Sequence, residues 1–204
     1  MKKIFFLIII KPIILIIAGV NVRGIKDLPV TGPCIVAANH NSHIDTLALM
    51  SLFPINGIDK IRPVAAADYF LKNRFSAWFF LNLIGIIPIS RKPDKSEGHP
   101  FDKVRKALEN NEIIIIFPEG SRGESEQMGR FKTGVAHLAK SFPEVPVLPI
   151  HIHGAGKCLP KGEALFVPFI IDIFVGKSIY HQETNVKEFT SLLEEEIKIL
   201  KGKQ

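Results

Sequence analysis

Runs of apolar, β-prone residues that end abruptly in polar residues recur along this chain, and they constrain its fold more than any other feature. The run IIIIF, residues 113–117, is apolar at every position and lacks the alternation of a strand with one face in water. Such a strand is buried on both faces, as in a parallel sheet covered by helices. The pattern therefore predicts an α/β protein.

The apolar runs alternate with segments of helical period, the order expected for a largely parallel, mixed sheet covered by helices. The predicted strands are Asn21–Arg23, Cys34–Ala38, Arg62–Ala66, Ile86–Ser90, Ile113–Phe117, Val147–His153 and Ile170–Val175. The predicted helices are Thr46–Leu52, Phe75–Ile84, Ser96–Asn110, Thr133–Phe142 and Lys187–Lys201. Because the sequence contains no internal repeat, low-complexity tract or linker, we expect residues 21–204 to form a single domain.

Residues 1–20 are the most apolar segment, but Lys11 and Pro12 divide it into the blocks Ile4–Ile10 and Ile13–Val20. A spanning helix needs about 20 consecutive apolar residues, and proline disrupts a helix interior. We therefore expect an apolar membrane anchor that lies in one leaflet or forms a short broken hairpin. A single spanning helix and a signal peptide are alternatives, although Lys11 and the lack of a small-x-small cleavage site count against the signal peptide.

Composition also points to a membrane surface. The mean hydropathy of +0.21 is high for a soluble protein and too low for a protein with several membrane spans. The formal net charge of +6 favours anionic partners, either nucleic acid or acidic lipid headgroups. Because no nucleic-acid-reading motif is present, we expect membrane lipids and no nucleic acid as partners. Cys34 and Cys158 are too far apart for a CxxC metal pair and too few for a disulfide framework.

The stretch NHNSHID, residues 39–45, lies between a predicted strand and a predicted helix. On one straight helix, His40 and Asp45 would point about 140° apart. If His40 ends the strand and Asp45 lies in the first helical turn, the loop can fold the carboxylate onto the imidazole. Asp45 then accepts a hydrogen bond from one ring nitrogen, and the other nitrogen is free to take a proton. The alternative is that the histidines are turn residues and Asp45 caps the helix.

Three further predicted strands end in polar or special residues, in the stretches GIIPISR, IIIIFPEGSR and VPVLPIHIHG. Ligands of open α/β sheets bind beyond the carboxyl ends of the strands, so these stretches should converge beside His40. Two arginines offer planar forks for a phosphate, a glycine lets backbone N–H groups approach an anion, and a lysine near a helix start adds charge. Together with Glu119 and Ser121, which follow the same strand as Gly120, the candidate binding residues are Arg91, Glu119, Gly120, Ser121, Arg122 and Lys132.

With NHNSHID, GIIPISR, FPEGSR and VPVLPI in this order, the chain resembles the glycerolipid acyltransferases typified by 1-acylglycerol-3-phosphate acyltransferase, over roughly residues 18–180. The resemblance implies a glycerol-3-phosphate acyltransferase-like fold, with His40 as general base and Asp45 as the residue that orients it. The residues that it implicates in binding the glycerol-phosphate acceptor are Arg91, Glu119, Gly120, Ser121 and Arg122. Pro88 and Ser90 depart from the family pattern, which leaves the acceptor headgroup open.

The implied reaction moves a fatty acyl group from acyl-CoA or acyl-carrier protein to the free hydroxyl of a lysophospholipid, first of all 1-acylglycerol-3-phosphate, to give phosphatidate. The thioester is a substrate, and neither a bound cofactor nor a metal is implied. Because the acceptor is membrane-held and the donor cytoplasmic, we expect the enzyme on the inner membrane surface. The alternatives are another lysolipid headgroup, a non-catalytic module that binds anionic lipid, and a metal-dependent lipid hydrolase. The metal ligands of that hydrolase would be His40, His43, Asp45, His151 and His153.

Overall fold

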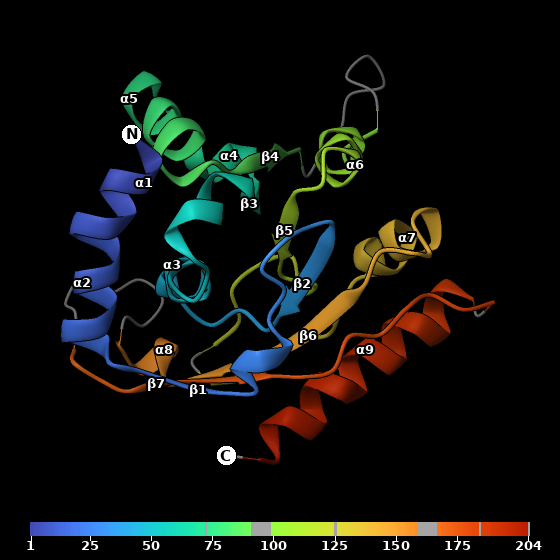
Figure 1. The fold of residues 1–204 in the computed structure, drawn as a ribbon. Coiled ribbons are helices and arrows are strands. Elements are labelled where there is room, and N and C mark those ends of the chain that lie inside the picture. The colour runs from blue at the N-terminus through green and yellow to red at the C-terminus, as the bar shows by residue number, and fades with distance from the viewer. Residues whose placement is uncertain (72, 91–98, 125, 159–166, 184, 204) are drawn as a thin grey trace.

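The computed structural model describes residues 1–71, 73–90, 99–124, 126–158, 167–183 and 185–203. Within these residues, seven strands form one sheet in the order β1-β7-β6-β2-β5-β3-β4 (Figure 1). The strands are β1 (Val20–Arg23), β2 (Cys34–Ala38), β3 (Ile61–Ala66), β4 (Ile87–Ile89), β5 (Ile113–Ile116), β6 (Val147–His153) and β7 (Ile171–Val175). All the predicted strands are present, each end within one residue of its predicted position.

The sheet is mixed and largely parallel, as predicted. Strands β6, β2, β5, β3 and β4 run parallel to one another. Strand β7 pairs antiparallel with β6, and β1 pairs parallel with β7. The five parallel strands therefore share one carboxyl edge, where the predicted site residues should meet.

Helical segments cover both faces of the sheet. The longer ones are α3 (Ile44–Ser51), α5 with η5 (Arg74–Trp78 and Phe79–Ile84), α6 (Asp102–Glu109), α7 (Gly134–Ser141) and α9 (Val186–Lys201). The short ones, which we did not predict, are η3 (Ile25–Asp27), η4 (Ile55–Lys60), α4 (Ala67–Phe70) and α8 (Ala155–Cys158). Each predicted helix is present, and each start except that of α6 lies within two residues of its predicted position.

Helix α6 begins at Asp102 and not at Ser96 as predicted. Ser96 lies outside the described residues, and the backbone just before the helix is a turn. The Asp102 carboxylate accepts a hydrogen bond from the His99 N–H at 2.9 Å, and His99 directly precedes Pro100. A residue before proline is disfavoured in the helical conformation, so the helix begins only after this turn.

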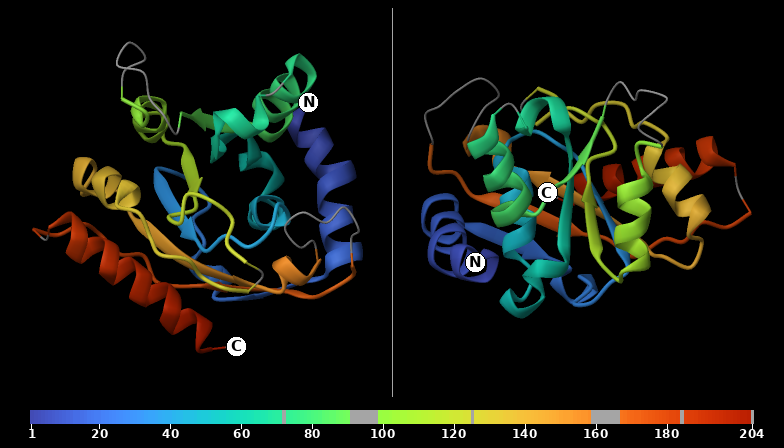
Figure 2. Two further views of the ribbon diagram at one scale, coloured as in Figure 1. Left: turned by 180° about the vertical axis from the view of Figure 1, so that it is seen from behind. Right: turned by 90° about the horizontal axis from the view of Figure 1, so that it is seen from above.

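Alternate residues of β2 pack against opposite layers of helices. Cys34, Val36 and Ala38 belong to a core cluster shared with the N-terminal helix and α3. Ile35 and Ala37 belong to a second cluster, shared with α6, α7 and α9. The two layers lie on opposite sides of the sheet in Figure 1, and Figure 2 shows the same separation from behind. This double burial explains the uniformly apolar strands.

Residues 2–18 form one helical stretch made of α1 (Lys2–Phe5), η1 (Phe6–Ile10), α2 (Lys11–Ile13) and η2 (Ile14–Ala18). A broken hairpin is therefore wrong, and the wide π-helical turns of η1 and η2 flank Pro12. One stripe, with Phe6, Ile10, Ile14 and Ala18, is buried in the core. None of the helices within the described residues has the length and apolarity needed to cross a membrane, so the spanning alternative is not supported.

Candidate active site

The loop between β2 and α3 brings His40 and Asp45 into direct contact. His40 Nδ1 lies 2.9 Å from Asp45 Oδ2. The same oxygen accepts the backbone N–H groups of Asn41 at 2.7 Å and Ser42 at 2.8 Å. These bonds wrap the loop around the carboxylate, which also lies in the first turn of α3, where a negative charge is favoured. The contact predicted from the sequence is therefore present.

The neighbours of His40 determine which nitrogen can accept a proton. The Asp45 side chain is fully buried, whereas 18% of the His40 side chain is exposed. An ionised carboxylate only accepts hydrogen bonds, so neutral His40 carries its proton on Nδ1 and leaves Nε2 as the acceptor nitrogen. The Phe117 ring, directly after β5, stacks on the imidazole with centroids 4.0 Å apart and an interplanar angle of 15°. The ring plane is therefore held from two sides.

Asn39 ties the beginning of this loop to β6. Its Nδ2 donates to the Ile152 carbonyl at 2.9 Å, and its Oδ1 accepts the Ile152 N–H at 2.7 Å. The side chain takes the place of a backbone pair just beyond the end of the β2–β6 ladder. Asn39 was not singled out in the sequence, where only its position after the strand could have marked it.

Glu119 links the His40 loop to the loop after β5. Its Oε1 accepts the His40 N–H at 2.8 Å, and its Oε2 accepts the Gly129 N–H at 2.8 Å. A further bond runs from the Gly123 N–H to the His40 carbonyl at 3.0 Å. Burial raises the pKa of the Glu119 carboxyl, and the two backbone hydrogen bonds oppose that rise. Both of its oxygens are thus engaged by backbone groups.

Arg122, Tyr69 and His43 form a second connected group beside the dyad. The Arg122 guanidinium lies over the Tyr69 ring, 5.4 Å from its centroid, and Tyr69 Oη lies 2.9 Å from His43 Nε2. Burial, followed by the charges of Arg122 and His40, lowers the pKa of His43 to about 4. A neutral His43 can accept a hydrogen bond from the Tyr69 hydroxyl. Tyr69 follows the carboxyl end of β3, which was the available sequence signal for it.

The remaining predicted site residues lie on the loop after β5, with one exception. Gly120 has a left-handed backbone with φ of 73°, and a Cβ there would lie 2.7 Å from Lys132 Nζ. The Lys132 side chain therefore crosses directly over Gly120. Ser121 is exposed on the same loop. Arg91 lies outside the described residues.

The ligand set of the hydrolase alternative is not assembled in the described part of the chain. There, no three His, Cys, Asp or Glu side chains group so that they could hold a metal ion. His153 Nδ1 instead lies 2.8 Å from Glu126 Oε2. The His151 ring is tilted against Phe174 with centroids 6.2 Å apart.

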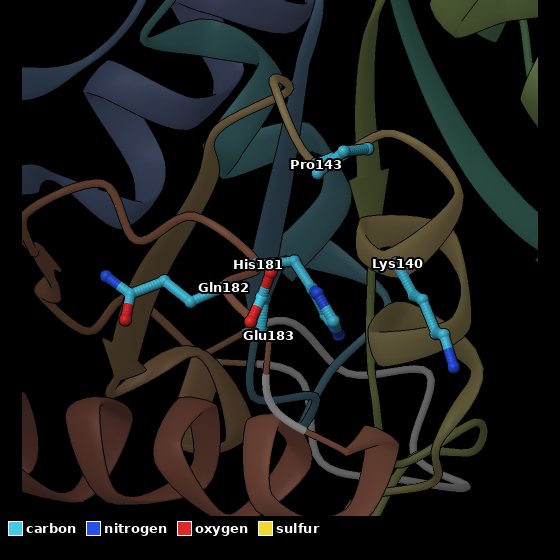
Figure 3. Close-up of a pocket in the computed structure, with 5 residues that line it drawn as sticks. All are labelled: Lys140, Pro143, His181, Gln182 and Glu183. Carbon is cyan, nitrogen blue, oxygen red and sulfur yellow. The ribbon is translucent and has the colours of Figure 1, made fainter.

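A surface depression of about 460 Å³ lies beyond the end of α7, away from these residues. It is lined by Lys140, Pro143, His181, Gln182 and Glu183 (Figure 3). The side chains of Lys140 and Gln182 diverge, so these polar groups do not converge on one ligand position. We assign no function to it.

Comparison with known proteins decides the family. The family model described as Acyltransferase matches residues 19–153. This chain belongs to the acyltransferase family. It is 34% identical over 132 residues to 1-acyl-sn-glycerol-3-phosphate acyltransferase alpha of Mus musculus, covering 64% of this chain and 44% of that protein. It is 31% identical over 169 residues to the 1-acyl-sn-glycerol-3-phosphate acyltransferase of Pseudomonas aeruginosa, covering 81% of this chain and 62% of that protein.

A solved structure of similar fold is that of the 1-acyl-sn-glycerophosphate (LPA) acyltransferase PlsC from Thermotoga maritima. Its TM-score is 0.76 at 20% identity, covering 97% of this chain and 76% of that one. The likeness supports the acyltransferase α/β fold. This chain spans about half the length of the curated relatives that it matches first.

Proposed function

We propose that this acyltransferase moves a fatty acyl group from an acyl thioester to the free hydroxyl of a lysophospholipid, with 1-acylglycerol-3-phosphate as acceptor and phosphatidate as product. The observation that carries the proposal is the 2.9 Å contact between His40 and Asp45 at the carboxyl edge of the sheet. Two of the relatives are named as acyltransferases of 1-acyl-sn-glycerol-3-phosphate, which supports this acceptor.

In this mechanism His40 Nε2 takes the proton of the acceptor hydroxyl as its oxygen attacks the thioester carbonyl. Asp45 stabilises the imidazolium that forms. The new C–O ester bond replaces the C–S bond, and the departing thiolate takes the proton from His40. Base catalysis of this kind contributes on the order of a hundred- to ten-thousand-fold, and the alignment of the substrates contributes further.

The acceptor phosphate is proposed to bind to the loop after β5. Arg122 and Lys132 supply positive charge there, and Gly120 lets the backbone approach. Ser121 and Arg91 remain candidates for the same site. Glu119 is proposed to act by holding His40 and Gly129 in place, because both of its oxygens accept backbone N–H groups.

The outer face of the N-terminal helix supports a place at the inner membrane surface. This face exposes Ile4, Leu7, Ile8, Leu15 and Ile16. We propose that residues 1–20 lie in the bilayer interface as a monotopic or peripheral anchor and that residues 21–204 form the single catalytic domain. Acyl-CoA or acyl-carrier protein would then arrive from the cytoplasm as the donor substrate, with no bound cofactor.

The test is thiol release from purified protein, with 1-acylglycerol-3-phosphate as acceptor and acyl-CoA or acyl-carrier protein as donor. His40→Ala should reduce the rate at least about a hundredfold, because it removes the base. His137→Ala, at an exposed histidine of α7, is the matched control and should keep the wild-type rate. An unchanged rate in His40→Ala would refute the mechanism.

The same assay separates the alternatives. A panel of lysolipids with different headgroups, followed by mass spectrometry of the products, identifies the acceptor. Loss of activity in EDTA would favour the metal-dependent hydrolase. Lipid binding without thiol release from any acceptor would favour the non-catalytic module.

A further inference from the structure

Glu126 has a backbone conformation that side chains rarely adopt. Its φ is 61°, in the left-handed region where glycine is at ease and residues with a Cβ are strained. It lies on the loop after β5, four residues beyond Arg122. A strained residue persists when contacts with its surroundings hold it in place.

The Glu126 carboxylate is held by three groups at the junction of β6 and α8. Its Oε2 accepts the Gly154 N–H at 2.9 Å and lies 2.8 Å from His153 Nδ1. Its Oε1 accepts the Gly156 N–H at 3.1 Å. Only 17% of the side chain is exposed. These contacts join segments that are 27 to 30 residues apart and account for the retention of the strained backbone.

The described residues of the loop after β5, 120–124 and 126–129, are thus fastened on two sides. Glu119 binds the Gly129 N–H at one end, and Glu126 fastens the middle of the loop to the end of β6. The dyad loop is attached to the same strand through the paired bonds of Asn39 and Ile152. The end of β6 therefore supports both the base and the proposed acceptor-binding loop, through separate side chains.

We propose that Glu126 is a positioning residue for acceptor binding: it fastens the loop after β5 to the end of β6 and so holds Arg122 in place beside Tyr69. The proposal rests on the proposed function, in which Arg122 binds the acceptor phosphate. Loss of the Glu126 contacts should weaken acceptor binding. It should leave the base in place, because the contacts that Asp45, Phe117 and Asn39 make in the dyad loop do not involve Glu126.

Two substitutions separate this role from backbone strain. Glu126→Gly removes the three contacts and relieves the strain, so a purely conformational role predicts equal or higher thermal stability and unchanged kinetics. Glu126→Gln keeps one carbonyl oxygen for the backbone N–H groups and loses the charge opposite His153. Glu124→Gln is the matched control, because Glu124 is exposed on the same loop.

The experiment measures kcat and acceptor KM for each variant, together with the affinity for short-chain 1-acylglycerol-3-phosphate in the absence of donor. Glu126→Gly should raise the KM and weaken the binding by about tenfold, the loss expected when an arginine–phosphate contact is misplaced. Its kcat at saturating acceptor should stay within about twofold of wild type. Glu126→Gln should be intermediate, and Glu124→Gln should match wild type. Unchanged KM and affinity in Glu126→Gly would overturn the proposal, as would a fall in kcat alone.

Hydrogen exchange gives a readout that does not depend on turnover. Glu126→Gly should accelerate exchange at the Gly154 and Gly156 amides and leave the Ile152 amide, bonded to Asn39, protected. Unchanged exchange at both glycines would refute the fastening of the loop. If the wild-type protein releases no thiol with any lysolipid, the proposed function fails. The hydrogen-exchange rates and the affinity for 1-acylglycerol-3-phosphate would still show whether Glu126 fastens the loop.

Discussion

At the scale of single residues, His40 must keep one tautomer and one ring orientation. Asp45 determines the tautomer through its contact with Nδ1, and Phe117 holds the ring plane. Glu119 holds the backbone N–H of the same residue. Each neighbour restrains a different degree of freedom, so substitution of each should change a different measured quantity.

Asp45→Asn tests the tautomer. The asparagine amide can donate to His40 Nδ1, which would place the ring proton on Nε2 and block base catalysis. We expect kcat for thiol release to fall at least about a hundredfold, with little change in acceptor KM. Glu144→Gln, at an exposed carboxylate, is the control. A kcat within a few-fold of wild type in Asp45→Asn would contradict this role for Asp45.

Tyr69 contributes its ring to Arg122 and its hydroxyl to His43, and two substitutions separate these contacts. Tyr69→Phe keeps the ring under Arg122, so acceptor KM should change little. Tyr69→Leu loses the cation–π contact as well, which contributes about 1 kcal/mol at a partly exposed site, so KM should rise about fivefold. Equal KM values for the two variants would show that the ring does not position Arg122.

At the scale of elements, the N-terminal helix separates its charges from its apolar surface. Lys2 Nζ donates to the Ile61 carbonyl at 2.8 Å, and Lys11 Nζ donates to the Phe53 carbonyl at 3.1 Å. Burial, helped by the charge of Arg62, lowers the pKa of Lys2 to about 8. Lys3 Nζ lies 3.5 Å from Asp59 Oδ2 at the start of the helix. Because Lys2 and Lys11 turn toward the protein and Lys3 pairs with Asp59, the exposed face from Ile4 to Ile16 is largely apolar.

That apolar face predicts membrane binding that depends on this helix. In sedimentation with anionic vesicles, replacing both Ile8 and Ile16 by Glu should reduce binding at least tenfold, since burial of each isoleucine contributes about 2 kcal/mol. Leu192→Glu, at an exposed position of α9 on the other side of the sheet, should bind as wild type does.

Trp78 offers an independent readout of the same contact. It is the single tryptophan of the chain and lies partly exposed on α5. The adjoining η5 packs against the N-terminal helix, with Phe5 and Phe79 centroids 5.6 Å apart. Vesicles should shift its emission to shorter wavelength in wild type and not in the double variant. Equal shifts in both would contradict the proposed orientation.

At the scale of the whole molecule, the sheet is covered on both faces, and buried titratable groups couple its stability to pH. His151 lies in β6 beneath the helical layer that includes α9. Burial lowers its pKa to about 4, and the charges of Lys201 and His153 act in the same direction. The His43 pKa is also lowered to about 4. Protonation of either residue therefore disfavours the folded state.

The sign of the pH effect follows from these lowered values. Between pH 6.5 and about 4, the unfolded chain binds more protons at these histidines than the folded protein does, so stability falls as the pH falls through this range. Between pH 6.5 and about 4, the free energy of unfolding of His151→Asn should therefore fall by on the order of 2 kcal/mol less than that of the wild-type protein. The measurement is Tm against pH for both proteins. Parallel curves over this range would show that His151 does not contribute.

The sequence alone was sufficient for the strands, most helices and the contact between His40 and Asp45. A run that is apolar at every position predicts a strand buried on both faces, and Ile113–Ile116 is such a strand. The dyad spans five residues of one loop, within reach of local backbone geometry. Strands, helices and contacts within one loop depend on residues that are close in the sequence, which is why pattern and spacing predict them.

Only the tertiary structure determined how distant segments complete the site. Glu119 meets His40 across 79 positions, Tyr69 reaches Arg122 from another strand end, and the inward turn of Lys2 depends on Ile61. In the sequence, Lys11 was an interruption of an apolar segment; in the fold, its partner is the Phe53 carbonyl. Such pairings depend on strand order and on the packing of layers, and local propensity carries no information about either.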